Sequence, residues 1–234
     1  MPNITQLKNE LQKLANPKTK VILERFFKTC KGEYGEGDIF LGIKVGPQRQ
    51  LAKKYKDLRL VDVIKLLHSE YHEARMAALF ILIFQFVKVD EQARKKIFNS
   101  YLINTRYINN WDLVDLSAPN IVGVYLLDKP RQVLYKLAKS KNLWERRIAI
   151  MATFSFIRDH QYSDSLKIAK ILLHDEHDLI HKAVGWMLRE VGKRDIETEE
   201  KFLQKYYKKM PRTMLRYAIE RFPEKKRKYY SAKK

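Results

Sequence analysis

The stretch Leu-Trp-Glu-Arg-Arg-Ile-Ala-Ile, residues 143–150, contains a pattern that recurs along the chain. Arg147-Ile148-Ala149 within it has three counterparts, at residues 75–77, 181–183 and 216–218. The alanines that end these four triplets are 72, 34 and 35 residues apart, and 72 is twice 36. A small residue at a constant phase lets paired helices pack closely. A period near 35 therefore indicates stacked helical hairpins.

The rest of the sequence supports an all-α fold. Nearly every segment has helical periodicity and none alternates convincingly as a strand, while breaks such as Asn16-Pro17 and Lys129-Pro130 separate the helices. We predict a right-handed superhelical solenoid of about six helical pairs, resembling HEAT repeats, with a concave basic face. The second helices of the pairs are expected to line that face, among them 109–117, 143–157 and 177–191.

The charge of the chain points to a polyanionic partner. The 234 residues include 47 Lys and Arg against 27 Asp and Glu, which gives a net charge of +20. Residues 201–234 hold 13 of the basic residues and only two acidic ones. A basic lining on a solenoid would follow a phosphate backbone. We expect residues 1–222 to form the repeat domain and residues 223–234 to form a loose basic tail.

Composition also limits the cellular context. The longest apolar run, residues 77–87, is interrupted by Gln85 and is shorter than a membrane-spanning helix. The first 14 residues have no apolar signal core. The single cysteine, Cys30, excludes an internal disulfide and suits a reducing compartment. We expect a monomer in the cytoplasm, associated with the nucleoid and with no membrane partner.

One segment departs from the repeat, NNWDLVDLSAP at residues 109–119. Asn110 suits the start of a helix, and a carboxylate at Asp112 suits its first turn. Asp115 is less expected, because it shares a face with the apolar Trp111, Val114 and Ala118. Pro119 cannot donate a backbone hydrogen bond, so the helix should bend or end there.

Asp115 has two interpretations that residue physics alone leaves open. It could be a structural carboxylate paired with a basic residue of the next repeat, such as Arg147, or it could act on a ligand. Trp111 and Trp186, taken singly, are more typical of a core. Gly185 before Trp186 would allow another group to approach closely. The occurrence of two tryptophans, one acid and one arginine at matching phases of the repeat favours a functional site.

Other chemical motifs are weaker. His174, His177 and His181 have spacings of three and four, but no HExxH motif accompanies them, so we expect no metal. Cys30 lacks an activating base nearby in the sequence. The glycine-rich stretch at 32–38 has no Gly-Lys-Ser/Thr ending and is interpreted as a loop.

Four blocks of the sequence resemble the AlkD-type DNA alkylation repair glycosylases over roughly residues 10–222. They are FLGIK with PQRQ (40–50), NNWDLVD (109–115), LWERRIAI (143–150) and IHKAVGWMLRE (180–190). The most specific are W-D-x-V-D and KAxGWxLRE. The resemblance implies a HEAT-like solenoid that binds duplex DNA and releases N3- and N7-alkylated purines as free bases, without a cofactor.

The resemblance also implies roles for individual residues. Asp115 matches the catalytic aspartate, Trp111 and Trp186 match two active-site tryptophans, and Arg147 matches an active-site arginine. The chain departs from the pattern at Glu145-Arg146 and in its basic tail, and neither change removes a catalytic position. Further basic residues are expected to contact DNA, namely Lys44, Arg49, Arg146, Lys182, Arg189 and Arg216.

The implied chemistry is consistent with these residues. An alkylated purine is already cationic and leaves as a neutral base, so a carboxylate that stabilises an oxocarbenium-like sugar and positions water is sufficient. The resemblance further implies that the lesion can stay in the duplex stack. The alternative is a non-catalytic HEAT-like scaffold for nucleic acid or an acidic protein, which would have no reason to keep Asp115 with two tryptophans.

Overall fold

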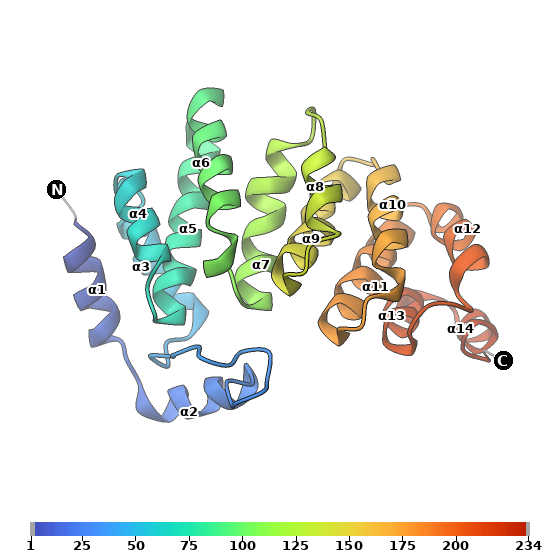
Figure 1. Cartoon of the computed structure of the whole chain (residues 1–234), viewed down its shortest axis with the longest axis horizontal. Coiled ribbons are helices and arrows are strands. Elements are labelled where there is room, and N and C mark those ends of the chain that lie inside the picture. The colour runs from blue at the N-terminus through green and yellow to red at the C-terminus, as the bar shows by residue number, and fades with distance from the viewer. Residues whose placement is uncertain (1–2, 233–234) are drawn as a thin grey trace. The chain divides into compact units, whose positions relative to one another are not determined.

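The computed structural model describes residues 3–232 and confirms the all-α prediction. This part of the chain forms fourteen α-helices and no β-strand, apart from one isolated bridge between Ile39 and Tyr71. The chain divides into two compact units, residues 1–117 and 118–234, called here the N-terminal and C-terminal units. Figure 1 shows the helices of each unit.

Helix α5 is the centre of the N-terminal unit. It packs against α3, α4, α6 and α7 and contains twelve buried residues. By contrast, α2 contains no buried residue and is set apart from the other helices of this unit (Figure 1). The helices of the unit are α1 (Ile4–Lys13), α2 (Pro17–Phe26), α3 (Val45–Lys54), α4 (Leu60–Leu67), α5 (His72–Lys88), α6 (Glu91–Ile103) and α7 (Trp111–Ser117).

A buried carboxylate, Glu73, fixes the loop that leads into α3. Its two oxygens accept hydrogen bonds from the backbone N–H groups of Leu41 (2.9 Å), Gly42 (2.8 Å) and Ile43 (3.1 Å). Gly42 has φ +85°, and a Cβ there would lie 2.1 Å from the carbonyl oxygen of Asn16. Hydrogen bonds to the buried carboxylate of Glu73 therefore fix the FLGIK block. At Gly42, any residue with a side chain would clash with the backbone of Asn16.

Glu73→Gln is expected to lower the free energy of unfolding by about 2 kcal/mol. Glutamine offers one acceptor oxygen in place of two, and its amide N–H₂ faces buried backbone donors. Urea denaturation measures the change. Glu70→Gln, at an exposed position of the same unit, is the control and should change stability by no more than about 0.5 kcal/mol. Equal stability of the two variants would contradict the role given to Glu73.

The C-terminal unit is built around α9 and α11. Helix α9 packs against its neighbours α8, α10 and α11 and against the π-helical segment Ala118–Gly123, and α11 packs against α12 and α13. A Cβ at Gly185 would lie 2.4 Å from the carbonyl oxygen of Met214, so this glycine allows the close approach of α13. The helices are α8 (Gln132–Leu137), α9 (Leu143–Arg158), α10 (Ser163–Ile171), α11 (Asp178–Gly192), α12 (Ile196–Tyr206), α13 (Arg212–Ala218) and α14 (Glu224–Ser231).

The alanines of the predicted repeat are buried in the structure, as close helix packing requires. The four repeat alanines, on α5, α9, α11 and α13, are 0% exposed: Ala77, Ala149, Ala183 and Ala218. Leu113, at the position of the missing copy on α7, is also 0% exposed. Helix α7 ends at Ser117, and Pro119 lies in the π-helical segment that follows. The predicted interruption by Pro119 is therefore confirmed.

The interpretation of the last residues as a loose tail is wrong for Glu224–Ser231, which form α14. Tyr230 in this helix is 3% exposed, and its ring centroid lies 5.3 Å from that of Tyr207 and 5.8 Å from that of Phe222. Arg212 also donates a hydrogen bond to the carbonyl of Ser231. Aromatic packing therefore anchors this basic segment, while the domain boundary at residue 222 stays a prediction.

The apolar run at residues 77–87 lies within α5, which is 17 residues long and mostly buried. Among the helices formed by residues 3–232, none combines the length and the apolar character that crossing a membrane requires.

Candidate active site

Helix α7 presents Trp111 and Asp115 on one face, because residues four apart on a helix lie one turn above each other. Both side chains are half-buried, whereas Leu113 and Val114 between them are 0% exposed. Tyr101 on α6 is 0% exposed and hydrogen-bonds Ser117 at 2.9 Å. Burial, and then the negative charge of Asp115, raise the pKa of Tyr101 well above its usual range. The carboxylate of Asp115 is thus close enough to Tyr101 on α6 to act on it electrostatically.

Trp111 is held by an aromatic column that the sequence did not reveal. Its ring stacks on Phe27 with centroids 5.2 Å apart and planes at 24°, and Phe26 meets it edge-on at 5.9 Å. Phe27 stacks in turn on Phe40 at 5.0 Å, and Phe40 stacks on His72 at 4.4 Å. The indole is therefore fixed by packing while part of its surface stays exposed.

A buried charged network lies at the start of α7. The side chain of Asp38, 2% exposed, accepts hydrogen bonds from Arg75, from Asn110 at 3.0 Å and from His72 Nδ1 at 3.1 Å. His72 Nε2 donates to Asp112 at 2.9 Å. Burial would raise the pKa of Asp38, but the hydrogen bond from His72 and the charge of Arg75 outweigh it and lower that pKa. Sequence reasoning missed Asp38 and His72, since neither lies in a recognisable motif.

The C-terminal unit holds the other two predicted site residues on adjacent helices. Trp186 on α11 is half-buried, donates from Nε1 to Glu190 at 3.2 Å, and has its ring 6.1 Å from Phe154. Arg147 on α9 is 4% exposed and donates to the carbonyl of Leu179 at the start of α11. Trp111 and Asp115 thus share α7, and Arg147 and Trp186 share the packed α9–α11 pair. A joint site formed by all four stays a prediction.

The six residues predicted to contact DNA differ in the exposure and the partners of their side chains. Lys44 is exposed at the N-cap of α3, and Arg49 is exposed in the middle of that helix. Arg146 is paired with Asp175 at 2.6 Å, Lys182 with Asp178 at 2.7 Å, and Arg189 with Glu220. The guanidinium of Arg216 lies 6.0 Å from the ring centroid of Tyr217. Contact with DNA stays a prediction for all six residues. Arg146, Lys182 and Arg189 also form ion pairs within the protein.

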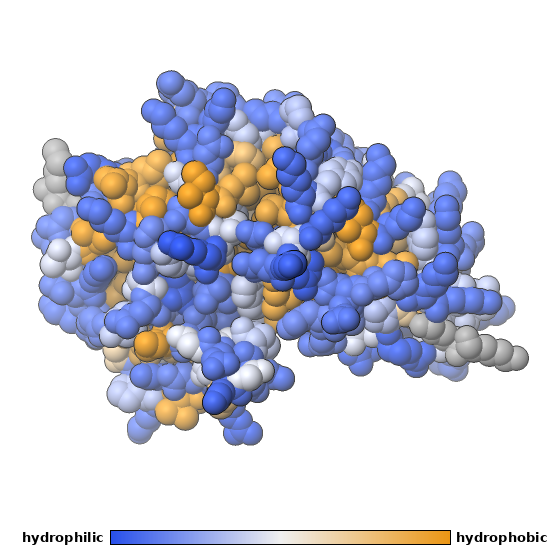
Figure 2. All heavy atoms as spheres, in the orientation of Figure 1, coloured by the Kyte–Doolittle hydropathy of each residue, from blue (hydrophilic) through white to orange (hydrophobic). Residues whose placement is uncertain are grey.

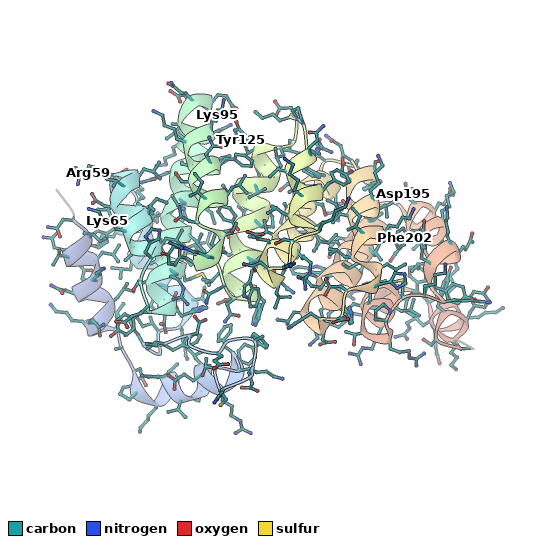
Figure 3. The ribbon with its side chains drawn as sticks, viewed as in Figure 1. Arg59, Lys65, Lys95, Tyr125, Asp195 and Phe202 are labelled. Carbon is teal, nitrogen blue, oxygen red and sulfur yellow. The ribbon has the colours of Figure 1, made fainter. Side chains whose placement is uncertain are left out.

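Hydrophilic residues cover most of the face seen in Figure 2, with hydrophobic patches between them, one of them over α2. Val21, Ile22 and Phe26 on that helix are at least 60% exposed. Basic side chains also project from α4 and α6, as Lys65 and Lys95 show in Figure 3. The positive charge is therefore distributed over both units and is not confined to residues 201–234.

Two of the three histidines considered as metal ligands, His177 and His181, make separate contacts. His177 Nδ1 accepts from the backbone N–H of Leu179 at 3.1 Å, and His181 Nε2 hydrogen-bonds the carbonyl of Asp175. Within residues 3–232 no three His, Cys, Asp or Glu side chains are grouped as metal ligands. Cys30 is exposed.

The sequence profile of the DNA alkylation repair enzymes matches residues 7–222. The chain belongs to this family. A solved structure described as a predicted DNA alkylation repair enzyme from Enterococcus faecalis has 16% sequence identity and a TM-score of 0.71, covering 90% of this chain and 97% of its own. A comparison with curated proteins gave no match. Membership of the family assigns the chain to the repair of alkylated DNA, and the solved structure shows the same fold.

Proposed function

We propose that this DNA alkylation repair enzyme is a monofunctional glycosylase that hydrolyses the N-glycosidic bond of N3- and N7-alkylated purines in duplex DNA. The observation that carries the proposal is the presence of a half-buried carboxylate, Asp115, and a half-buried indole, Trp111, on one face of α7. A helix that only packs in a core would present an apolar residue, and not a carboxylate, at position 115.

Asp115 supplies the negative charge that this reaction needs. As the glycosidic bond breaks, the deoxyribose becomes oxocarbenium-like, and a fixed carboxylate nearby lowers the energy of that state. The same carboxylate orients the attacking water or accepts its proton. The cationic purine leaves as a neutral base, so a general acid is not required.

Trp111 offers a rigid surface for the cationic base and the sugar, because an aromatic face attracts positive charge. The stack on Phe27 keeps that surface in place when DNA binds. In the C-terminal unit, Trp186 is proposed to make a second such surface. Arg147 is proposed, from the family resemblance, as an active-site arginine. The resemblance further suggests excision from a stacked base pair.

The test is incubation of the purified protein with methylated duplex DNA, followed by chromatography of the released material. We expect free 3-methyladenine and 7-methylguanine to appear, with abasic sites left in an unbroken strand. Binding of the DNA without release of any base would instead support a non-catalytic scaffold.

DNA binding is expected to depend strongly on salt and weakly on base sequence. For each phosphate neutralised, the slope of log K against log salt changes by about −0.9. Replacing the exposed Lys201, Lys205 and Lys208 by Gln should flatten this slope and weaken binding to unrelated duplexes about equally. Fluorescence anisotropy on two duplexes of different sequence measures both effects. A loss confined to one duplex would contradict phosphate binding by these lysines.

A further inference from the structure

We propose that Asp38, His72 and Asp112 form a positioning triad that holds the first turn of α7 and so sets the orientation of Trp111 and Asp115. Asp112 lies in the W-D-x-V-D block, whereas Asp38 and His72 belong to none of the four blocks that carry the family resemblance. Its value for catalysis rests on the proposed function of Asp115, whereas its effect on Trp111 does not.

The triad joins three segments that are distant in the sequence. Asp38 lies in the loop before α3, His72 is the first residue of α5, and Asp112 is the second residue of α7. Each imidazole nitrogen has its own carboxylate, Nδ1 at 3.1 Å from Asp38 and Nε2 at 2.9 Å from Asp112. His72 and the side chain of Asp38 are only 2% exposed. The link to α7 is therefore sheltered from water, where charged hydrogen bonds are strongest.

Two carboxylate acceptors require two N–H donors, so the geometry calls for a doubly protonated imidazolium. Burial opposes this charge, but the hydrogen bonds and negative charges of Asp112 and Asp38 outweigh burial and raise the pKa of His72 to about 9. Arg75 pairs with the other oxygen of Asp38, and Glu73 is engaged by the backbone of Leu41 to Ile43. The cations His72 and Arg75 thus balance the carboxylates of Asp38 and Asp112, while Glu73 is bound by backbone N–H groups. A neutral His72 would leave one excess negative charge among these four side chains.

His72 is also linked to α7 through a series of stacked rings. Phe40 stacks on the imidazole, Phe27 stacks on Phe40, and Trp111 stacks on Phe27. Asp38 also accepts from Asn110, whose own Oδ1 accepts from the backbone N–H of Trp111 at 2.8 Å. The start of α7 is therefore tied to the triad through a carboxylate, an amide and an aromatic column. A change at His72 should reach Trp111 and Asp115 together.

The test compares His72→Gln and Asp112→Asn with the wild-type chain. Glutamine removes the charge that bridges the two carboxylates. Asp112 has a side chain 14% exposed, so Asn at that position tests the link with less disturbance of the core. Both variants should excise alkylated bases at least tenfold more slowly in single-turnover reactions, while the Kd for duplex DNA changes by less than about twofold. The matched control is His68→Gln, an exposed histidine of the same unit that should react at the wild-type rate.

A fluorescence measurement separates the triad from the proposed catalysis. In a chain carrying Trp144→Phe and Trp186→Phe, Trp111 is the only indole. The emission of Trp111 should shift when His72→Gln or Asp112→Asn is added to this chain. Without either substitution, the emission should change with pH, with a midpoint near the pKa of His72, about 9. Circular dichroism confirms that each variant is folded.

The outcomes are distinct. Wild-type excision rates in both variants, or Trp111 emission that neither variant alters, would overturn the triad. If the wild-type chain releases no base at all, the proposed function fails, and the emission of Trp111 alone decides whether the triad positions α7.

Discussion

Asp115→Asn should fold and bind duplex DNA like the wild-type chain, yet release alkylated purines at least about a hundredfold more slowly. Asparagine keeps the shape of the side chain and can still hydrogen-bond, but it lacks the charge that stabilises an oxocarbenium-like sugar. Loss of one such electrostatic contact typically costs about 3 kcal/mol of transition-state stabilisation, which corresponds to this factor. Single-turnover base release measures it.

The same variant decides between a catalytic and a structural Asp115. If the carboxylate served mainly to pair with a buried cation such as Arg147, its loss would lower the free energy of unfolding by about 3 to 5 kcal/mol. Thermal denaturation of the variant therefore accompanies the kinetic measurement. Asp178→Asn is the control, since its side chain is 54% exposed and lies at the start of α11. Full activity combined with a large loss of stability would make Asp115 a structural residue.

Glu199→Gln is expected to stabilise the protein by about 3 kcal/mol at pH 7. Glu199 lies on α12 between Asp195 and Phe202, both labelled in Figure 3. It is 1% exposed, and its Oε1 makes no hydrogen bond. Burial, with the nearby charge of Glu200, raises its pKa from 4.5 to about 9. The folded protein therefore keeps a proton at neutral pH that the unfolded chain releases.

The sign of the pH dependence follows from that raised pKa. The stability contributed by neutral Glu199 is complete below pH 4.5 and is lost as the pH rises toward about 9. Glutamine does not titrate, so the difference between variant and wild type should be near zero at pH 4 and grow through pH 7. Denaturation at several pH values measures it, with the exposed Glu197→Gln as control. A constant difference across this range would contradict a raised pKa for Glu199.

Local sequence determined the helical character of the chain, the phase of the repeat helices and the end of α7. The repeat alanines predicted from a period near 35 are all fully buried. The helical period of 3.6 residues places each of them on the apolar face of its helix, and an apolar face is the one that packs against the core. Pro119 predicted the end of α7 because the missing N–H is a property of that residue alone. The shared face of Trp111 and Asp115 followed from their spacing of four.

Only the tertiary structure decided what surrounds that face. Asp38 and His72 are 34 residues apart, and His72 and Asp112 are 40 apart, so no local pattern could pair them. The stack of Phe27 on Trp111 and the docking of Tyr230 in α14 likewise join segments distant in sequence. Hydrogen bonds and ring contacts of this kind form only when helices and loops that are distant in sequence pack against one another. Helical periodicity states which face of each helix is buried, but not which residue of another segment will cover it.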